Sequence, residues 1–74
     1  MMVNKVGEVR KCLGLSQEEL ARDAGISRVY LSKIETGRST PTYPIVYRLS
    51  KRLRKPAEEL FFSSNGNYDI KNGS

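Results

Sequence analysis

Apolar residues recur along most of this chain at spacings of three or four, the period of an α-helix that buries one face. The first such segment lies between Asn4, a candidate helix cap, and Gly14. Its apolar stripe consists of Val6, Val9 and Leu13. Gly14 is placed to end a helix in the left-handed conformation. The pattern therefore predicts an α-helix across this segment.

Two further helices are predicted on either side of a single glycine. The first begins with a capping box, in which Ser16 caps the helix and Glu19 reaches back to it, and it ends at Gly25. The second begins at Ser27, a favourable cap, and ends at Gly37. Their side chains predicted to face the core are Leu20, Ala21, Ala24, Tyr30, Leu31 and Ile34.

A fourth helix is predicted after the loop of residues 38–41. Thr42 is its expected cap, and Pro44 falls in the first turn, where a missing backbone N–H is tolerated. Its apolar face consists of Ile45, Val46, Leu49 and Leu53. A short fifth helix is expected over residues 56–62.

The end of the chain has a different composition. Residues 63–74 are rich in Ser, Asn and Gly and are expected to form a polar, flexible tail, in which Tyr68 and Ile70 give only a weak indication of a strand. The sequence thus predicts an all-α fold. A compact five-helix bundle occupies residues 1–62, and a short flexible C-terminal tail follows at 63–74.

The composition argues against several classes of protein. With one cysteine, Cys12, and no histidine, the chain has no internal disulfide, no Cys/His zinc site and no histidine base. It also has no glycine-rich phosphate loop and no nucleophile–base pair. We therefore expect no enzyme activity, cofactor or metal. No apolar run is long enough to cross a membrane and no signal peptide is evident, so a cytoplasmic protein is expected.

Positive charge is concentrated in the middle of the chain. The 74 residues carry 13 basic and 8 acidic side chains, for a net charge of +5. Residues 26–55 hold eight basic side chains against Glu35 alone, which gives this stretch +7. Such an excess indicates a polyanionic partner that binds the middle of the chain.

The second and third predicted helices form a helix-turn-helix in outline. Ala21 is small where a crossing helix must come close, and Gly25 supplies the positive φ of the turn. The sequences of residues 17–21 (QEELA), 24–28 (AGISR) and 31–37 (LSKIETG), followed by Pro41, resemble the lambda-repressor-like family, the Cro/repressor or xenobiotic-response-element type of helix-turn-helix. The resemblance covers about residues 4–61.

The resemblance implies a function and a set of contact residues. Members are transcriptional regulators of bacterial or phage type that usually bind palindromic operators as homodimers, with the third helix in the major groove of double-stranded DNA. Matching positions suggest phosphate contacts from Gln17 and from the loop after the third helix, and base contacts from the first turns of that helix. The DNA-contact residues implied are Gln17, Ser27, Arg28, Val29, Tyr30, Ser32, Lys33, Arg38 and Thr40. Arg10 and Glu35 match a structural ion pair of the family.

Three positions depart from the family pattern. Arg54 stands where the family often has the glycine that ends the fourth helix, so this turn is expected to be built differently. Lys55 and Pro56 replace an apolar residue and a serine cap, which places the start of the fifth helix in question. Tyr30 is bulkier than the usual small residue and has room to reach toward DNA instead of packing inward.

The apolar run Leu60, Phe61 and Phe62 is the predicted homodimer interface. A helix this short cannot turn three consecutive side chains inward, so Leu60 and one Phe are expected in the core and the other Phe on a second copy. The leading hypothesis is a sequence-specific DNA-binding transcriptional repressor. The alternative is an antitoxin or other protein-interaction module whose tail, residues 63–74, folds on a protein partner.

A second basic stripe on the fourth helix leaves two interpretations open. Arg48, Arg52 and Lys55 lie at i, i+4 and i+7, and they form either a second anion-binding surface or, as the sequence favours, a plain solvated face.

Overall fold

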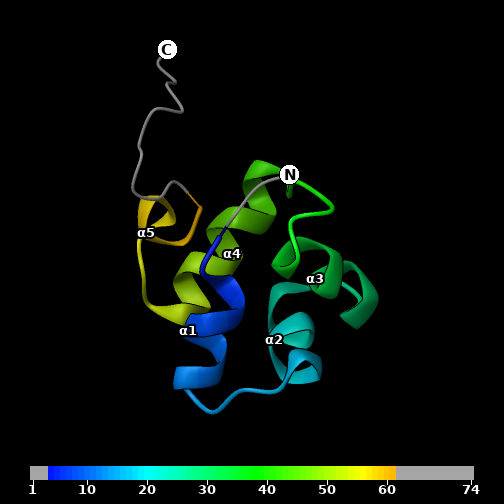
Figure 1. Cartoon of the computed structure of the whole chain (residues 1–74), viewed down its shortest axis with the longest axis horizontal. Coiled ribbons are helices and arrows are strands. Elements are labelled where there is room, and N and C mark those ends of the chain that lie inside the picture. The colour runs from blue at the N-terminus through cyan, green and yellow to red at the C-terminus, as the bar shows by residue number, and fades with distance from the viewer. Residues whose placement is uncertain (1–3, 62–74) are drawn as a thin grey trace.

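The computed structural model describes residues 4–61, which form a bundle of five helices and the turns between them (Figure 1). The helices are α1 (Val6–Cys12), α2 (Gln17–Ala24), α3 (Arg28–Glu35), α4 (Tyr43–Leu53) and α5 (Ala57–Phe61). The all-helical class and the order of the five helices agree with the prediction. The predictions for Phe62, for the tail and for a strand at Tyr68 and Ile70 lie outside the described residues.

Local signals determine where the helices begin. Ser16 Oγ accepts a hydrogen bond from the Glu19 N–H at 3.0 Å, and Glu19 Oε1 accepts one from the Ser16 N–H at 2.9 Å, which confirms the capping box. Ser27 Oγ caps α3 by accepting from the Tyr30 N–H at 3.0 Å. Thr42 occupies the N-cap position of α4 but makes no side-chain capping bond. These three predicted caps are therefore in place, and two of them, Ser16 and Ser27, are closed by side chains.

Asn4 has a different role from the one predicted. The N-cap of α1 is Lys5, so Asn4 is not the cap itself. Its Oδ1 accepts from the Val6 N–H at 3.0 Å, and its Nδ2 donates to the carbonyl of Ile34 at 2.8 Å. Asn4 thus ties the start of α1 to the end of α3.

The core collects apolar side chains from all five helices. Its members are Val6, Leu20, Ala21, Ala24, Leu31, Ile34, Leu49, Leu53, Leu60 and Phe61. Leu13 is a correction to the predicted stripe, because its side chain is 49% exposed. The reason is that α1 ends at Cys12, and Leu13 is the residue where the chain leaves the helical path. Leu15 packs against the core instead.

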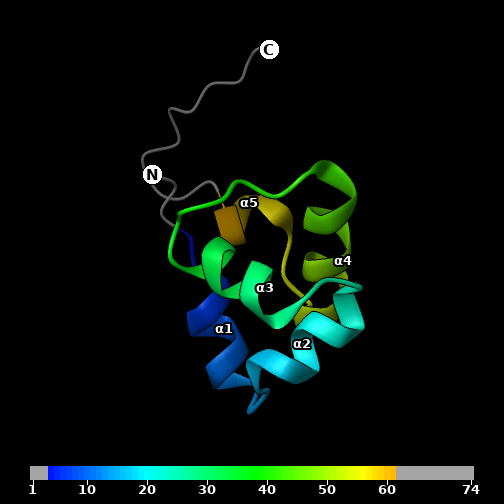
Figure 2. The same ribbon diagram turned by 90° about the vertical axis from the view of Figure 1, so that its right-hand side faces the viewer.

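Packing of α4 holds the first two helices in place. It contacts α1, α2 and α5 (Figure 1), whereas α3 packs against α1 and α2 (Figure 2). Arg52 Nε lies 2.5 Å from Asp23 Oδ2, and Arg48 Nη1 lies 3.5 Å from the carbonyl oxygen of Ala24 at the end of α2. Lys55 Nζ lies 3.9 Å from Glu59 Oε1. The basic stripe of α4 therefore makes contacts within the bundle.

The turn between α4 and α5 corrects one expectation. Arg54 adopts the left-handed conformation, with φ 60° and ψ 38°, so it occupies the conformation that a glycine would take and the turn is not built differently. The Lys55 N–H donates to the carbonyl of Ser50 at 3.2 Å and closes this turn. The carbonyl of Pro56 accepts from the Glu59 N–H at 2.9 Å, and α5 begins at Ala57.

Within residues 4–61, no helix has the length and apolar character needed to cross a membrane. In the same part of the chain, no cluster of three or more Cys, Asp or Glu side chains is placed to bind a metal ion.

Candidate nucleic-acid interface

The turn between α2 and α3 is short and closed by backbone hydrogen bonds. Gly25 has φ 73°, a conformation that glycine adopts without a steric penalty. The N–H groups of Gly25 and Ile26 donate to the carbonyls of Arg22 and Ala21 at 3.2 and 2.9 Å. Ser27 then caps α3, so the orientation of α3 is set from its first residue.

Burial divides α3 into an inner and an outer face. Leu31 and Ile34 are buried, which turns the remaining positions outward or to the sides. The outer positions that the structure leaves exposed are Ser27, Arg28, Val29 and Lys33, and the half-buried ones are Tyr30 and Ser32. The side chain of Val29, 56% exposed, has no place in the core. The first half of α3 therefore presents one basic, hydrogen-bonding face with an apolar spot in it.

Tyr30 is half-buried and packs against the core. This agrees with its predicted inward position and leaves only part of the ring accessible. A DNA contact from Tyr30 stays a prediction.

The loop after α3 continues this surface. Arg38 and Thr40 are exposed, and the N–H groups of Arg38 and Ser39 donate to the carbonyl of Lys33 at 2.8 and 3.2 Å. Pro41 is buried at the far side of the loop. Because the loop is bonded to the end of α3, its exposed side chains keep a defined place beside the helix.

The three cations of this surface carry unneutralised charge. Among residues 4–61, the ion pairs involve Arg10, Arg52 and Lys55, and none involves Arg28, Lys33 or Arg38. The positive charge of α3 and its loop is therefore available to a polyanion.

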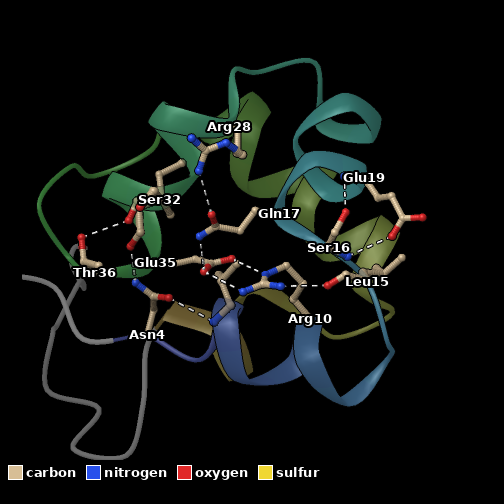
Figure 3. A network of polar contacts seen from close by, with 12 residues as sticks. Asn4, Arg10, Leu15, Ser16, Gln17, Glu19, Arg28, Ser32, Glu35 and Thr36 are labelled. Carbon is tan, nitrogen blue, oxygen red and sulfur yellow. Dashed lines mark hydrogen bonds and ion pairs between the residues drawn. The ribbon is translucent and has the colours of Figure 1, made fainter.

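The predicted ion pair between α1 and α3 is confirmed (Figure 3). Arg10 Nε donates to Glu35 Oε2 at 2.7 Å and Arg10 Nη2 donates to Glu35 Oε1 at 3.2 Å, with side chains that are only 10% and 9% exposed. Arg10 Nη1 also donates to the carbonyl of Leu15 at 2.8 Å. The two side chains share two hydrogen bonds and are largely removed from water, so the attraction between their charges is stronger than in an exposed pair.

Gln17 links this ion pair to the outer face of α3. Its Nε2 donates to Glu35 Oε1 at 3.1 Å, and its Oε1 accepts from Arg28 Nη1 at 3.3 Å (Figure 3). Sequence reasoning assigned Gln17 a phosphate contact and missed both partners. The three residues are 11 and 18 positions apart in the chain, and no periodicity connects such spacings. The phosphate contact itself stays a prediction.

Leu60 and Phe61 lie in the core of their own chain, at 1% and 4% exposure. This agrees with the expectation that Leu60 and one Phe join the core. It also leaves these two side chains almost no surface for a second copy, because the bundle already covers them. Phe62, the remaining member of the predicted dimer interface, lies outside the described residues, and its role there stays a prediction.

Comparison with known proteins places this arrangement in a family. A helix-turn-helix family model matches residues 6–60. An uncharacterized HTH-type transcriptional regulator of Methanothermobacter thermautotrophicus is 39% identical over 57 residues, which make up 76% of this chain and 83% of that protein.

Solved structures share the fold. The restriction-modification controller protein of Aeromonas hydrophila superposes with a TM-score of 0.70 at 31% identity, over 74% of this chain and 83% of that one. The P22 c2 repressor, crystallised with a synthetic operator, gives a TM-score of 0.71 at 28% identity, over 73% and 82% of the two chains. The family match spans α1 to α5 and includes the turn and the exposed helix described above. The chain belongs to the lambda-repressor-like helix-turn-helix family of DNA-binding transcriptional regulators.

Proposed function

We propose that this protein is a sequence-specific repressor that binds a palindromic operator as a homodimer, with α3 in the major groove. The observation that carries the proposal is the outer face of α3, where Arg28, Val29 and Lys33 are exposed. The major groove is about 12 Å wide and admits an α-helix. Arg28 has the donors to bond guanine O6 and N7 together, and Val29 offers a methyl surface to thymine.

Phosphate contacts from the neighbouring loop support the same docking. Arg38 and Thr40 are exposed beside the end of α3, and a cation and a hydroxyl there suit the two strands that border the groove. The similarity to a repressor that was crystallised on its operator also supports this mode of binding.

A homodimer is proposed because one recognition helix reads too few base pairs. A single helix covers about 4–5 base pairs, and two-fold symmetry doubles the site. The two copies of α3 would then lie about 34 Å apart, one turn of B-DNA.

Selection of bound DNA from a random pool tests the proposal. The expected result is a two-fold symmetric sequence with half-sites one helical turn apart. Binding should weaken about 10³- to 10⁵-fold between 50 and 200 mM salt if about 6–10 phosphates are contacted per dimer. A pool that yields no preferred sequence would overturn the proposal.

Two variants separate base recognition from phosphate contact. Arg28→Ala should cost about 1–3 kcal/mol on the selected site and relax the preference at one base pair of each half-site. Arg38→Ala is the matched control, because it removes an equal charge from the same surface. It should weaken binding to all sequences by about the same factor. An unchanged preference in Arg28→Ala would show that another residue reads the base.

A further inference from the structure

Asn4 joins the segment that leads into α1 to the C-terminal end of α3. Its Nδ2 donates to the carbonyl oxygen of Ile34 at 2.8 Å, although the two residues are 30 positions apart in the chain (Figure 3). We propose that Asn4 is a positioning residue for DNA binding. It fixes the turn that ends α3 and thereby holds the loop that carries Arg38 and Thr40 beside the helix. The inference rests on the proposed function, which gives this loop its phosphate contacts.

The turn after α3 has the hydrogen bonds of a Schellman motif, in which N–H groups beyond the helix fold back onto its last carbonyls. Thr36 is the C-cap, and Gly37 follows with φ 80°. The Gly37 N–H donates to the carbonyl of Ile34 at 3.0 Å. The Arg38 N–H donates to the carbonyl of Lys33 at 2.8 Å. The backbone of Arg38 therefore has a set place beside α3 as long as this turn stays closed.

Asn4 strengthens the turn at the carbonyl of Ile34. This oxygen has two lone pairs, and it accepts one hydrogen bond from Gly37 and one from Asn4. With both lone pairs in use, none is left for the Arg38 N–H, four residues on, which a continued α-helix would require. The Asn4 amide thus favours the end of α3 at this turn.

Asn4 is itself attached to the core and to α5. Its Oδ1 accepts from the Val6 N–H at 3.0 Å, which is an Asx turn, and the side chain of Val6 is fully buried. The N–H of Lys5, between these two residues, donates to the carbonyl of Leu60 in α5 at 2.8 Å. The side-chain amide therefore presents its Nδ2 to α3 from a fixed position.

A loop that is held in place before DNA arrives binds phosphates better. Arg38 and Thr40 are both exposed, so their side chains are accessible to the DNA backbone. Ordering such a loop on binding costs conformational entropy, and a loop that is already ordered avoids part of this cost. Because phosphates carry no sequence information, the contribution of Asn4 should be the same on every DNA sequence.

The test compares Asn4→Ser with the wild type. A serine hydroxyl can accept from the Val6 N–H, as Asn4 does, but it is too short to reach the carbonyl of Ile34. The dissociation constant should rise about 3- to 10-fold per bound copy, the range for one lost hydrogen bond, and by the same factor on the selected operator and on unrelated DNA. In a chain that already carries Arg38→Ala and Thr40→Ala, the same substitution should change the dissociation constant less than 2-fold.

Two control variants separate positioning from charge and from stability. Asn4→Asp also keeps the Asx turn and removes the donor, but it adds a negative charge. Weaker binding in Asn4→Asp without weaker binding in Asn4→Ser would mean charge repulsion alone and would overturn the inference. Val9→Ala removes packing against the core from α1, so it should lower the thermal midpoint but leave the affinity for DNA within 2-fold of the wild type. An equal loss of affinity in Val9→Ala and Asn4→Ser would show that only stability matters.

Measurements on the free protein give a readout that does not depend on DNA. The ¹⁵N relaxation of the backbone amides of residues 37–40 should show greater mobility in Asn4→Ser and Asn4→Asp than in the wild type and Val9→Ala. Unchanged mobility in both Asn4 variants would contradict the positioning role. Equal weakening of DNA binding by Asn4→Ser with and without the side chains of Arg38 and Thr40 would contradict it too. A wild type that selects no sequence would instead overturn the proposed function.

Discussion

Arg54 adopts a backbone conformation that is unfavourable for any residue with a side chain. Among residues 4–61 it is the one non-glycine residue with a positive φ. The left-handed region costs an L-residue about 1–2 kcal/mol because Cβ approaches the carbonyl oxygen. The closing bond from Lys55 to Ser50 and the packing of α4 and α5 keep the turn in place despite this cost.

Replacing Arg54 with glycine should therefore stabilise the protein. We expect Arg54→Gly to raise the free energy of unfolding by about 1 kcal/mol, after the greater freedom of glycine in the unfolded chain is subtracted. For a domain of this size that corresponds to about 4–8 °C in the thermal midpoint. Lys55→Gly removes an equal charge at a residue of ordinary φ, and it should lower the midpoint. A midpoint that falls in Arg54→Gly would show that the turn carries no strain.

Gly7 is the residue that lets Glu35 of α3 come close to α1 and pair with Arg10. A Cβ at this position would stand 3.0 Å from Glu35 Oε1. In an unobstructed helix, Gly→Ala stabilises by about 1 kcal/mol. Here the new methyl group would push against a carboxylate that Arg10 and Gln17 both hold, so we expect Gly7→Ala to lower the thermal midpoint. A higher midpoint would mean that Glu35 moves aside easily.

At the scale of single helices, the capping box of α2 connects stability with pH. The hydrogen bond from the Ser16 backbone N–H, and after it the contact with the Ser16 hydroxyl, lowers the pKa of the Glu19 carboxyl from its ordinary value. A carboxyl whose pKa is lower in the folded state stabilises the fold above its unfolded pKa. That contribution is lost as the pH falls through the folded pKa.

The expected result is a pH-dependent difference between Glu19→Gln and the wild type. Chemical unfolding at neutral pH should find the variant less stable, and the difference should shrink as the pH falls below the ordinary pKa of a glutamate. Glu18→Gln, one residue away and outside the capping box, controls for the loss of a negative charge at the helix start. A difference that stays constant from neutral to acid pH would contradict the role of the ionised Glu19.

The elements were predictable where their signals are local. The helix ends are predicted by Ser16 with Glu19, by Ser27 and by the glycines at 14, 25 and 37, and the structure places a helix end within two residues of each. Leu13 was not predictable from periodicity, because the stripe continues past the residue where the helix stops. Arg54 was not predictable from propensity, because the packing of α4 and α5 overrides it.

The candidate site also has one part that the sequence predicts and one part that depends on how the helices pack. The exposed face of α3 follows from the two buried positions Leu31 and Ile34, which the sequence shows. The network through Gln17 depends on how α1, α2 and α3 come together, and the distances that create it exist only in the folded chain.

At the scale of the whole molecule, the basic side chains of α3 and its loop differ from Arg48 and Arg52 of α4 in their contacts within residues 4–61. Arg28, Lys33 and Arg38 stay outside the ion pairs of residues 4–61, whereas on α4 Arg52 pairs with Asp23 at the surface and Arg48 donates to the carbonyl of Ala24. Net charge alone does not distinguish the two groups. We therefore expect the phosphate-binding surface on the α3 side, and a symmetric operator requires a second copy to present another such surface.

The predicted dimer depends on Phe62. With Leu60 and Phe61 buried in their own chain, Phe62 is the member of the apolar run left for a partner. Sedimentation of the wild type should show a monomer–dimer equilibrium that operator DNA shifts to the dimer. Phe62→Ser should remain monomeric at the same concentrations, while its circular dichroism stays helical and it still binds a half-site weakly. Val29→Ser is the matched control, because it also replaces an apolar side chain with serine, on the face proposed for DNA, and it should dimerise normally. A wild type that is monomeric at every concentration, with and without operator, would overturn the homodimer and require a partner of another kind to double the site.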